Sequence, residues 1–288
     1  MTLEQLRIFV AVAERQHMTR AAEVLHLTQS AVSAAIAALE ARHDVRLFHR
    51  VGRGIELTDA GRALLDDARA VLARAADAEQ ALTDRGALLR GRLMLVASQT
   101  IASYWLPRFL AQFSTAHPGV VIDLAMANTA QAAEQVLAGE FELGFVEGTV
   151  DHPALARWPV GEDALHLVRA EPAAAVDADW LRRTPWVMRE PGSGTRTSLE
   201  AALARMGICP AELKVALTLP SNEAVRTAVA AGEGVACLSS LVVEPLVGLG
   251  RLHRLDLALS PRSFYGLRHK ERYRSRAAEV LLDIIAKG

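Results

Sequence analysis

The sequence predicts an α/β chain in two parts: an all-α, winged helix-turn-helix domain, and a two-subdomain α/β domain joined to it by one long helix. Three observations indicate this arrangement. Short helical periodicities fill residues 1–44, a proline-free stretch rich in alanine, leucine and arginine runs from 58 to 89, and strand-like apolar runs alternate with helical runs thereafter. At 288 residues the chain also exceeds the usual single core of about 100–150 residues.

Three apolar stripes predict three helices at the N-terminus. The first stripe consists of Leu3, Leu6, Phe9, Val10 and Ala13. Thr19 is expected to cap a short second helix that turns Ala22 and Leu25 inward, and Thr28 is expected to cap a third. The buried stripe of the third helix is Val32, Ile36 and Leu39, which leaves its polar residues facing outward.

The outward face of the third helix carries side chains that can recognise DNA bases. Two short helices joined by a tight turn suit a helix-turn-helix, whose second helix enters the major groove. Gln29 can bond an adenine edge at two points, and Ser30 and Ser33 can each donate or accept a hydrogen bond. Thr28, at the helix start, completes this set. Three ordinary core helices with polar faces explain the periodicity equally well.

Two short strands after the third helix predict a wing. They are Val45–Arg50 and Val51–Leu57, and Arg53 stands between two glycines at the tip, where it can enter a minor groove. The whole chain has a net charge of −1, so a DNA contact depends on local basic residues rather than on bulk charge. This local group is Arg42, Arg46, Arg50 and Arg53. A surface hairpin with solvated arginines is the alternative.

From Ala21 to Gly61 the chain contains, without a gap, the strings LTQSAVS, IAALE, RLFHR and LTDAG. This run resembles the DNA-binding domain of the LysR-type transcriptional regulators. The resemblance implies a bacterial regulator that binds double-stranded promoter DNA. One position departs from the family, because Ala34 stands where many relatives carry arginine or another long polar residue. Base recognition is therefore expected to depend on Gln29, Ser33 and the wing.

A single long helix is expected from a cap at Thr58 to about Leu89. A heptad seam along it would let two such helices pack together, and the seam consists of Leu64, Ala68, Val71, Ala75, Ala78 and Leu82. The alternative is a helix that lies on its own domain, but that domain is too small to cover so long a stripe. A dimer would place two recognition helices about 34–36 Å apart on the DNA, and the family resemblance extends the assembly to tetramers.

Strand-like runs in the C-terminal part are 93–97, 120–126, 143–146, 186–188, 215–219 and 235–238. Four turns carry hydroxyl or amide side chains and open helices; they contain Ser98, Gln99 and Thr100, then Asn128 and Thr129, then Thr195, and then Ser221 and Asn222. In open α/β sheets, ligands lie at the carboxyl ends of strands, where helix N-termini suit an anion. A small anionic effector is therefore expected, although capping alone explains any single one of these residues.

The family resemblance continues through this part, which is similar to the effector domain of the same regulators. It implies two subdomains around a cleft, with the fold of type 2 periplasmic binding proteins, and a cleft lined by Ser98, Thr100, Asn128, Thr195 and Ser221. Glu147 follows a predicted strand and would favour a ligand with an amine or a protonated oxygen. The string SQTIASYWLP is similar to the branch that includes regulators of sulfur assimilation and carbon fixation. A small carboxylate, an amino-acid derivative or a sulfur oxyanion is the expected effector.

The expected division of the chain has three parts. Residues 1–58 form the winged helix-turn-helix domain, 59–89 the linker and dimerisation helix, and 90–288 the effector-binding domain. Within the last part, subdomain I covers about 90–160 plus 266–288, and subdomain II covers about 161–265. RNA polymerase is a candidate partner beside DNA, the effector and a second copy of the chain.

Signatures of an enzyme or an exported protein are missing from the sequence. There is no Gly-x-Ser-x-Gly elbow, no phosphate-binding loop and no His-Glu-x-x-His motif, so no catalysis, cofactor or metal is expected. The start lacks a signal segment, and no run approaches the ~20 apolar residues of a membrane span. This argues against a transport binding protein and predicts a cytoplasmic location. Cys209 and Cys237 are expected to be reduced and partly buried, with a redox-sensing pair as the alternative.

Overall fold

The computed structural model describes residues 1–51, 54–83, 89–148, 150–172, 176–257 and 259–288. The chain divides into two compact units near residue 85, and each unit has hydrophobic clusters of its own. Among the described residues, no single helix is both long and apolar enough to cross a bilayer. The helices Met18–Leu25 and Gln29–His43 pass the same test only jointly, across a bend of 109°.

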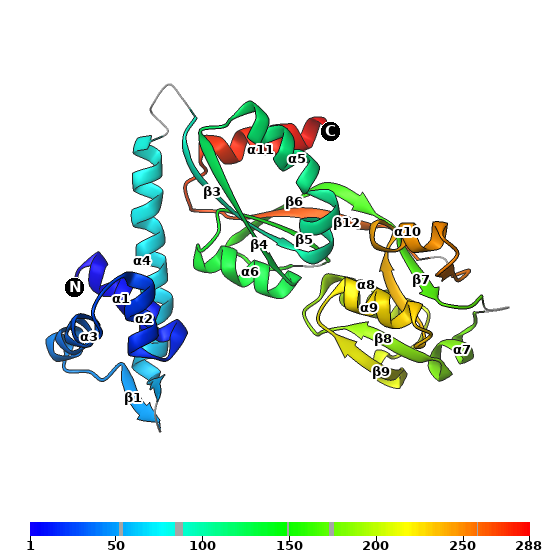
Figure 1. Cartoon of the computed structure of the whole chain (residues 1–288), viewed down its shortest axis with the longest axis horizontal. Helices are drawn as coiled ribbons and strands as arrows, with labels where there is room; N and C mark the ends of the chain where they lie inside the picture. The colour runs from blue at the N-terminus through cyan, green and yellow to red at the C-terminus, as the bar shows by residue number, and fades with distance from the viewer. Residues whose placement is uncertain (52–53, 84–88, 149, 173–175, 258) are drawn as a thin grey trace. The chain divides into compact units, whose positions relative to one another are not determined.

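The N-terminal unit consists of three short helices, a two-stranded wing and a long helix (Figure 1). Its elements are α1 (Leu3–Arg15), α2 (Met18–Leu25), α3 (Gln29–His43), β1 (Phe48–Val51), β2 (Gly54–Leu57) and α4 (Asp59–Thr83). The two strands pair antiparallel, with Phe48 opposite Leu57. The predicted helix-turn-helix, wing and long helix are therefore confirmed. The last residues expected in the long helix, 84–88, lie outside the described residues.

Side-chain caps fix the starts of these helices. Thr28 and Thr58 each accept a backbone N–H of the following turn, as predicted. The predicted cap at Thr19 is wrong. α2 begins two residues earlier, and the cap is His17, whose Nδ1 accepts the backbone N–H three residues on at 3.5 Å. The reason is that Gln16 ends α1 in the left-handed conformation, with φ of 49°, so the chain reverses at once and His17 already occupies the cap position.

The three short helices and the first half of α4 enclose one core. Its largest buried side chains are Leu6, Phe9, Val12, Val32, Ile36, Leu39, Leu47 and Phe48. Leu64 and Ala68 of α4 join this core, where α4 packs against α1, and Ala68 is only 1% exposed. The chain's own domain therefore covers Ala68 fully and Leu64 in part, which removes Ala68 from the predicted heptad seam, and the rest of the seam stays a prediction. Farther along the helix, Val71 and Leu82 are exposed.

The C-terminal unit contains two subdomains, and the first is built on a five-stranded sheet in the order β4-β3-β5-β12-β6. The strands are β3 (Gly91–Ser98), β4 (Val120–Ala127), β5 (Leu143–Glu147), β6 (Leu155–Asp163) and β12 (Arg262–His269). β4, β3 and β5 run parallel, and β12 runs antiparallel to both of its neighbours. The strand predictions at 93–97, 120–126 and 143–146 are confirmed, whereas β6 and β12 were not predicted.

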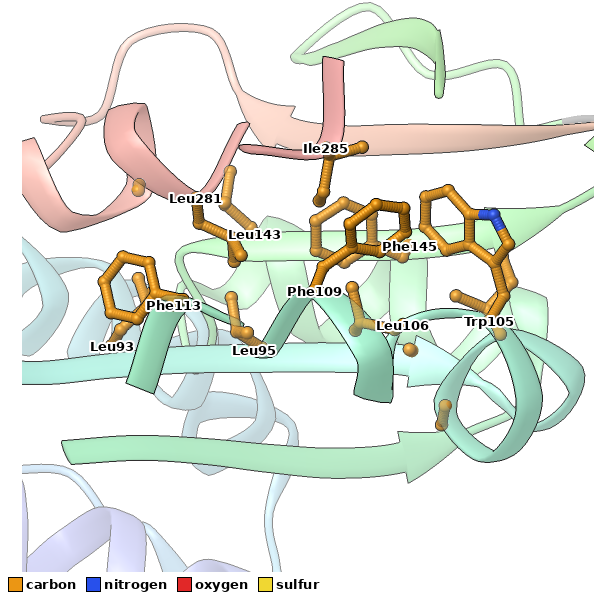
Figure 2. Close-up of a cluster of buried hydrophobic side chains, with 14 of the residues drawn as sticks. Leu93, Leu95, Trp105, Leu106, Phe109, Phe113, Leu143, Phe145, Leu281 and Ile285 are labelled. Atoms are coloured by element: carbon orange, nitrogen blue, oxygen red, sulfur yellow. The ribbon is translucent and has the colours of Figure 1, made fainter. Parts of the chain in front are cut away.

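Helices cover both faces of this sheet. α5 (Pro107–Ala116) and α11 (Arg276–Lys287) pack on one face, and Figure 2 shows the buried cluster there, which includes Leu95, Trp105, Phe109, Phe113, Phe145, Leu281 and Ile285. α6 (Thr129–Ala138) packs on the other face with Val96 and Val146. Adjacent residues of β3 therefore serve opposite faces, as a pleated strand requires. A π-helical turn, η1 (Ile101–Trp105), joins β3 to α5.

The second subdomain combines the antiparallel strands β10-β7-β11 with the parallel pair β8-β9. These strands are β7 (Leu165–Arg169), β8 (Pro185–Arg189), β9 (Lys214–Leu219), β10 (Ala236–Ser239) and β11 (His253–Arg254). A parallel bridge between Trp186 and Val235 joins the two groups. The helices are α7 (Ala178–Arg183), α8 (Gly194–Arg205), η2 (Pro210–Glu212), α9 (Asn222–Ala230) and α10 (Ser240–Gly248). The strand predictions at 186–188, 215–219 and 235–238 are confirmed.

Two strands of the first sheet lead into the second subdomain. β6 ends at Asp163 just before β7, β12 begins at Arg262, and these two residues are partners in the β12–β6 register. The divisions expected at 160/161 and 265/266 fall inside β6 and β12. The sheet therefore extends a few residues farther than expected on both crossing strands, because neither strand was recognised in the sequence.

Candidate functional sites

The start of α3 presents a polar, accessible face. Gln29 and Ser30 are exposed and Ser33 is half-buried, whereas Val32 is fully buried. Thr28 Oγ1 accepts a backbone N–H of the first turn at 3.2 Å and lies 3.0 Å from Ser30 Oγ. The predicted base-reading side chains thus share one face at a helix N-terminus, where backbone N–H groups also attract phosphate.

The wing carries an exposed arginine beside a hollow in the surface. Arg50 on β1 lies opposite Ile55 on β2. Both residues line a hollow of about 340 Å³, together with the residues that connect α1 to α2. Arg53, which was predicted at the wing tip, lies outside the described residues. Arg50 is therefore the described wing residue that fits a phosphate contact.

A buried carboxylate reduces the local positive charge that the sequence predicted. Glu40 Oε1 accepts the backbone N–H groups of Leu47 at 2.8 Å and Phe48 at 3.3 Å, and Oε2 lies 3.0 Å from Arg46 Nη1. The carboxylate thus ties the C-terminal half of α3 to the start of the wing. Because Arg46 is paired with Glu40, the predicted group of four arginines is less basic than its composition suggests.

The carboxyl ends of β3 and β5 bring four polar residues of the first subdomain together. Ser98 Oγ donates to Glu147 Oε2, and Thr100 Oγ1 donates to Glu147 Oε1 at 3.2 Å. Thr129, at the start of α6, donates to the backbone carbonyl of Glu147 at 2.7 Å. All four residues are buried. Glu147 is therefore the common acceptor of these residues, which form one wall of the predicted cleft.

Hydrogen bonds run from this wall to α9 of the second subdomain. The backbone N–H of Asn222 donates to Gln99 Oε1 at 2.7 Å, and Asn222 Nδ2 donates to Thr100 Oγ1 at 3.1 Å. Gln99 Nε2 and the Tyr104 hydroxyl donate to the two carboxylate oxygens of Glu223, at 2.7 Å and 2.8 Å. Burial and the neighbouring Glu223 raise the pKa of Tyr104. The two walls of the predicted cleft are thus in direct contact.

Arg262 is the charged centre of this contact. Its Nε and Nη2 donate to Asp163 Oδ2 at 2.8 Å and 2.7 Å. Its Nη1 donates to Thr195 Oγ1 at 3.0 Å and lies 3.5 Å from Glu147 Oε1, while Nη2 lies 3.3 Å from Thr100 Oγ1. Burial raises the pKa of Glu147, and the guanidinium of Arg262 offsets this only in part. One guanidinium on β12 therefore joins side chains of both subdomains.

A second ion pair, between a buried arginine and a half-buried glutamate, lies at the end of β8. Arg189 is 4% exposed, and its Nε and Nη2 donate to the two carboxylate oxygens of Glu190 at 2.8 Å and 2.9 Å. Its Nη1 donates to Asn222 Oδ1. Asn128 Nδ2, on the first subdomain, lies 3.5 Å from Glu190 Oε1. Through Asn222 the pair connects the network of Arg262 to Asn128.

Most of the predicted cleft residues belong to one connected network, namely Ser98, Gln99, Thr100, Asn128, Thr129, Glu147, Thr195 and Asn222. Ser221 instead caps α9, since its Oγ accepts a backbone N–H at 3.0 Å. Sequence reasoning missed Arg262, Asp163 and Arg189. The first two lie on strands without a strand-like sequence signal. Arg189 directly follows the predicted strand 186–188, so a search for polar side chains at the end of that strand could have found it.

The two cysteines lie in different environments. Cys237 is buried, and burial raises the pKa of its thiol to about 12. Cys209 is exposed, so the expectation that it is partly buried is wrong. Within the part of the chain that the structure describes, no group of three His, Cys, Asp or Glu residues is placed to hold a metal ion.

Both parts of the chain match known protein families. Residues 3–62 match the family "Bacterial regulatory helix-turn-helix protein, lysR family", and residues 86–288 match the "LysR substrate binding domain". The HTH-type transcriptional regulator YeiE of Escherichia coli K12, described as uncharacterized, is 33% identical over 289 residues, which are 98% of this chain and 96% of that protein. The HTH-type transcriptional regulator CbbR of Rhodospirillum rubrum is 33% identical over 291 residues, 98% of this chain and 95% of that protein.

Solved structures share the fold of the whole chain or of a large part of it. Full-length CbnR, crystallised in complex with its target DNA, aligns with a TM-score of 0.68 at 24% identity and covers 100% of this chain and 99% of that chain. The regulatory domain of CcmR from Synechocystis PCC6803, in complex with 2-PG, aligns with a TM-score of 0.62 at 26% identity. That alignment covers 69% of this chain and 97% of the CcmR domain.

Proposed function

The chain belongs to the LysR family of transcriptional regulators, and from that membership we propose which of its residues read DNA and which bind its effector. As a family member it is a DNA-binding transcription regulator with a domain for a small-molecule effector, and it is not an enzyme. We assign DNA binding to residues 1–58, the linking helix to 59–89 and effector binding to 90–288. The two effector subdomains meet at Asp163 and Arg262.

The proposed DNA-reading residues are Thr28, Gln29, Ser30, Ser33, Arg50 and Arg53. The exposed start of α3 supports the first four, because only residues on that face can reach base edges in a major groove. Arg50 and Arg53 would hold the phosphate backbone or a narrow minor groove beside it. Ala34 offers no polar atom, so Gln29 and Ser33 carry most of the direct readout.

The proposed effector residues are Ser98, Gln99, Thr100, Asn128, Thr129, Glu147, Thr195, Ser221 and Asn222. One observation carries this assignment. Thr100 Oγ1 is shared by Glu147, Asn222 and Arg262, so three segments of the chain converge on one hydroxyl between the subdomains. A ligand that enters there exchanges these internal bonds for its own. Its binding would therefore change how the subdomains contact one another.

We propose a small anion as the effector, and a carboxylate, an amino-acid derivative or a sulfur oxyanion are its candidate classes. The guanidinium groups of Arg189 and Arg262 and the N-terminus of α8 all favour negative charge at this place. The complex of the CcmR domain with 2-PG supports a small-molecule ligand for a domain of this fold. The carboxylate of Glu147 lies in the same place and further restricts which of these classes of effector can bind.

The regulator is proposed to act as a dimer or a tetramer. The exposed Val71 and Leu82 on α4 support this proposal, and so do the apolar side chains Val121, Met126, Val215 and Leu217 on the edge strands β4 and β9. A dimer doubles the number of DNA contacts at half-sites about one helical turn apart. RNA polymerase is a candidate partner at the promoter, and the cytoplasm, where promoter DNA is found, is the proposed location.

Effector binding is proposed to shift the equilibrium between two arrangements of the effector subdomains. The linking helices would carry that shift to the DNA-binding domains and alter their spacing on the promoter. Such a shift requires that the ligand bind the two arrangements with different affinities. Footprints with and without ligand that agree in extent and in DNA bending would contradict this mechanism.

Gel-shift and thermal-shift measurements on the full chain test the proposed function. An operator is first selected from random duplexes, and small acids, amino acids and sulfur oxyanions are then screened for stabilisation of the protein. Thr100→Ala should bind the operator as wild type does but lose stabilisation by the hit, whereas the exposed Thr115→Ala should keep both. Arg50→Ala and Arg53→Ala should weaken operator binding, whereas Arg251→Ala, at another exposed position, should not.

A further inference from the structure

The carboxylate of Glu147 lies among groups that would bind an anion. The hydroxyls of Ser98 and Thr100 donate to it, and Arg262 Nη1 lies 3.5 Å away. The first turn of α8 packs against the same residue, because a Cβ on Gly194 would overlap the backbone oxygen of Glu147 and lie 2.6 Å from its Cγ. α8 has no side-chain cap, so the N–H groups and the positive dipole end of its first turn point to an anionic partner. The anion that occupies this position is the carboxylate of Glu147 itself.

The positive charges around Glu147 are already balanced. Arg262 holds Asp163 through Nε and Nη2, and Arg189 holds Glu190 through two bonds. Glu223 adds a further carboxylate at the edge of the network. A second bare anion beside Glu147 would therefore meet an unbalanced negative charge at low dielectric, where repulsion is strong.

Space for a small ion exists next to this centre. A hollow of about 280 Å³ is lined by Gly148, which follows Glu147, and by Arg262. The hydroxyl-bearing residues Thr197, Ser198 and Ser263 line the same hollow. A tetrahedral oxyanion has five heavy atoms where water, which occupies about 30 Å³ in the liquid, has one, and a hollow of this volume has room for such an ion. Glu147 itself is buried and does not line this hollow, so an ion there meets Arg262 first and contacts the Glu147 carboxylate only if it replaces some of the bonds that cover it.

We propose that Glu147 selects an effector whose anionic group carries an O–H: the ligand donates this hydrogen bond to the Glu147 carboxylate and places its negative oxygens toward Arg262 and the start of α8. This inference rests on the proposed effector site and names the class of ligand for it, a monoprotonated oxyanion such as hydrogen phosphate or an acid ester of the same kind. A buried carboxylate without a hydrogen-bond donor is costly. Because Glu147 is buried, a ligand that displaces one of its present donors is favoured when it supplies a donor of its own.

An amine could also donate to Glu147, but the surroundings oppose it. A cationic nitrogen there would lie near the guanidinium of Arg262, and the other groups that contact the carboxylate are the hydroxyl donors Ser98 and Thr100. Asp163, the other acid of this centre, already accepts bonds from Arg262 and Ser239. A hydroxyl on an oxyanion supplies the donor without adding a positive charge.

Inorganic phosphate and sulfate separate these possibilities in the full-length protein. At mildly alkaline pH both are tetrahedral and carry two negative charges, but only phosphate keeps a proton. Isothermal titration of wild type should show phosphate binding at least about tenfold more tightly than sulfate, as a site built around one hydrogen bond demands. Glu147→Gln removes the negative charge at nearly the same shape, so sulfate affinity should rise at least about tenfold and the selectivity should be lost. The exposed Glu162→Gln is the matched control and should keep the selectivity of wild type.

Three results would overturn the inference. The first is that wild type binds sulfate as tightly as phosphate. The second is that glycine binds in place of both ions, and the third is that neither ion binds wild type or Glu147→Gln. The comparison of the two ions on wild type needs no variant, so it holds even if Glu147→Gln fails to fold. Operator binding and its response to the screened effector are measured on the same preparations. A protein that still responds but does not distinguish the two ions retains the effector site and lacks the proton requirement.

Discussion

Arg262 and Asp163 are register partners on the antiparallel strands β12 and β6, and both Nε and Nη2 of the arginine bond one carboxylate oxygen. The other oxygen of Asp163 accepts from Ser239 Oγ at 2.8 Å. Both residues are buried. Asp163 is the last residue of β6 and Arg262 is the first residue of β12, and these two strands link the subdomains. A change in the angle between the subdomains is therefore expected to occur around this pair. The remaining N–H groups of Arg262 contact Thr195 and Thr100 on either side.

Arg262→Ala should lower the free energy of unfolding by about 3–5 kcal/mol, because it leaves the Asp163 carboxylate buried without its cation. Urea unfolding followed by circular dichroism measures the loss. Arg205→Ala is the matched control, since this exposed arginine bonds Ser260 at the surface, and it should change stability by less than about 0.5 kcal/mol. Equal stability of the two variants would show that the pair does not hold the subdomains together.

Glu147 should make the stability of the protein depend on pH. Burial raises its pKa in the folded state above the unfolded value, so the folded chain holds this proton more tightly. The stabilising contribution is complete at a pH below the unfolded pKa and is lost as the pH rises through the folded pKa. Glu147→Gln removes this titration, so its free energy of unfolding should gain on that of wild type as the pH rises above the ordinary carboxyl value of about 4.5. A difference between the two proteins that does not change with pH would contradict the prediction.

The sequence predicted the fold well wherever apolar periodicity was strong. The six predicted strands and the three N-terminal helices are all present, because each is an apolar run or stripe bounded by turn residues. β6 was missed because it is an edge strand that contains Pro159 and Gly161, which a central strand would not tolerate. Its partner β12 has a register shift between Phe264 and Tyr265, so its alternation is irregular as well.

The candidate site was predictable only on the side where polar residues follow recognised strands. Ser98, Thr100 and Glu147 end two such strands, and the structure brings them together. Arg262 and Asp163 could not be found in this way, because pairing between strands 99 residues apart depends on the register of the whole sheet. No local pattern carries that information.

Gln29→Ala should reduce the preference for operator over unrelated DNA by about 1–3 kcal/mol, because a two-point bond to a base would be lost. Gln29 is exposed at the start of α3, so its truncation should leave the fold unchanged. Gel-shift titrations on the selected operator and on a scrambled duplex measure the difference. Gln112→Ala, an exposed glutamine within α5, is the control. Unchanged discrimination by Gln29→Ala would remove this residue from the base-reading set.

Cys237 should resist alkylation in the native protein, whereas Cys209 should react. Cys237 is buried and its thiol pKa is raised to about 12, so it stays protonated near neutral pH. Cys209 is exposed. Mass spectrometry after a short iodoacetamide pulse should find label on Cys209 alone, and on both cysteines in urea. Equal labelling of Cys237 in the native protein would mean that the second subdomain opens readily.

Leu82→Glu should weaken self-association through α4. Leu82 is 69% exposed and lies on the same helix as the exposed Val71, beyond the part of α4 that packs in the N-terminal core. If this end of the helix meets its copy in a dimer, each protomer loses the burial of one leucine, about 1.5–3 kcal/mol. A symmetric dimer loses it twice, so the dissociation constant should rise about 100-fold or more.

Sedimentation velocity across a range of protein concentrations measures this change. Leu249→Glu is the matched control, because Leu249 is 73% exposed and belongs to the other unit of the chain. It adds the same charge and removes the same apolar side chain, so it should leave the association of wild type intact. If both variants associate like wild type, α4 does not form the dimer contact, and the exposed edge strands β4 and β9 become the surfaces to test, with Val121→Glu and Val215→Glu as the next variants.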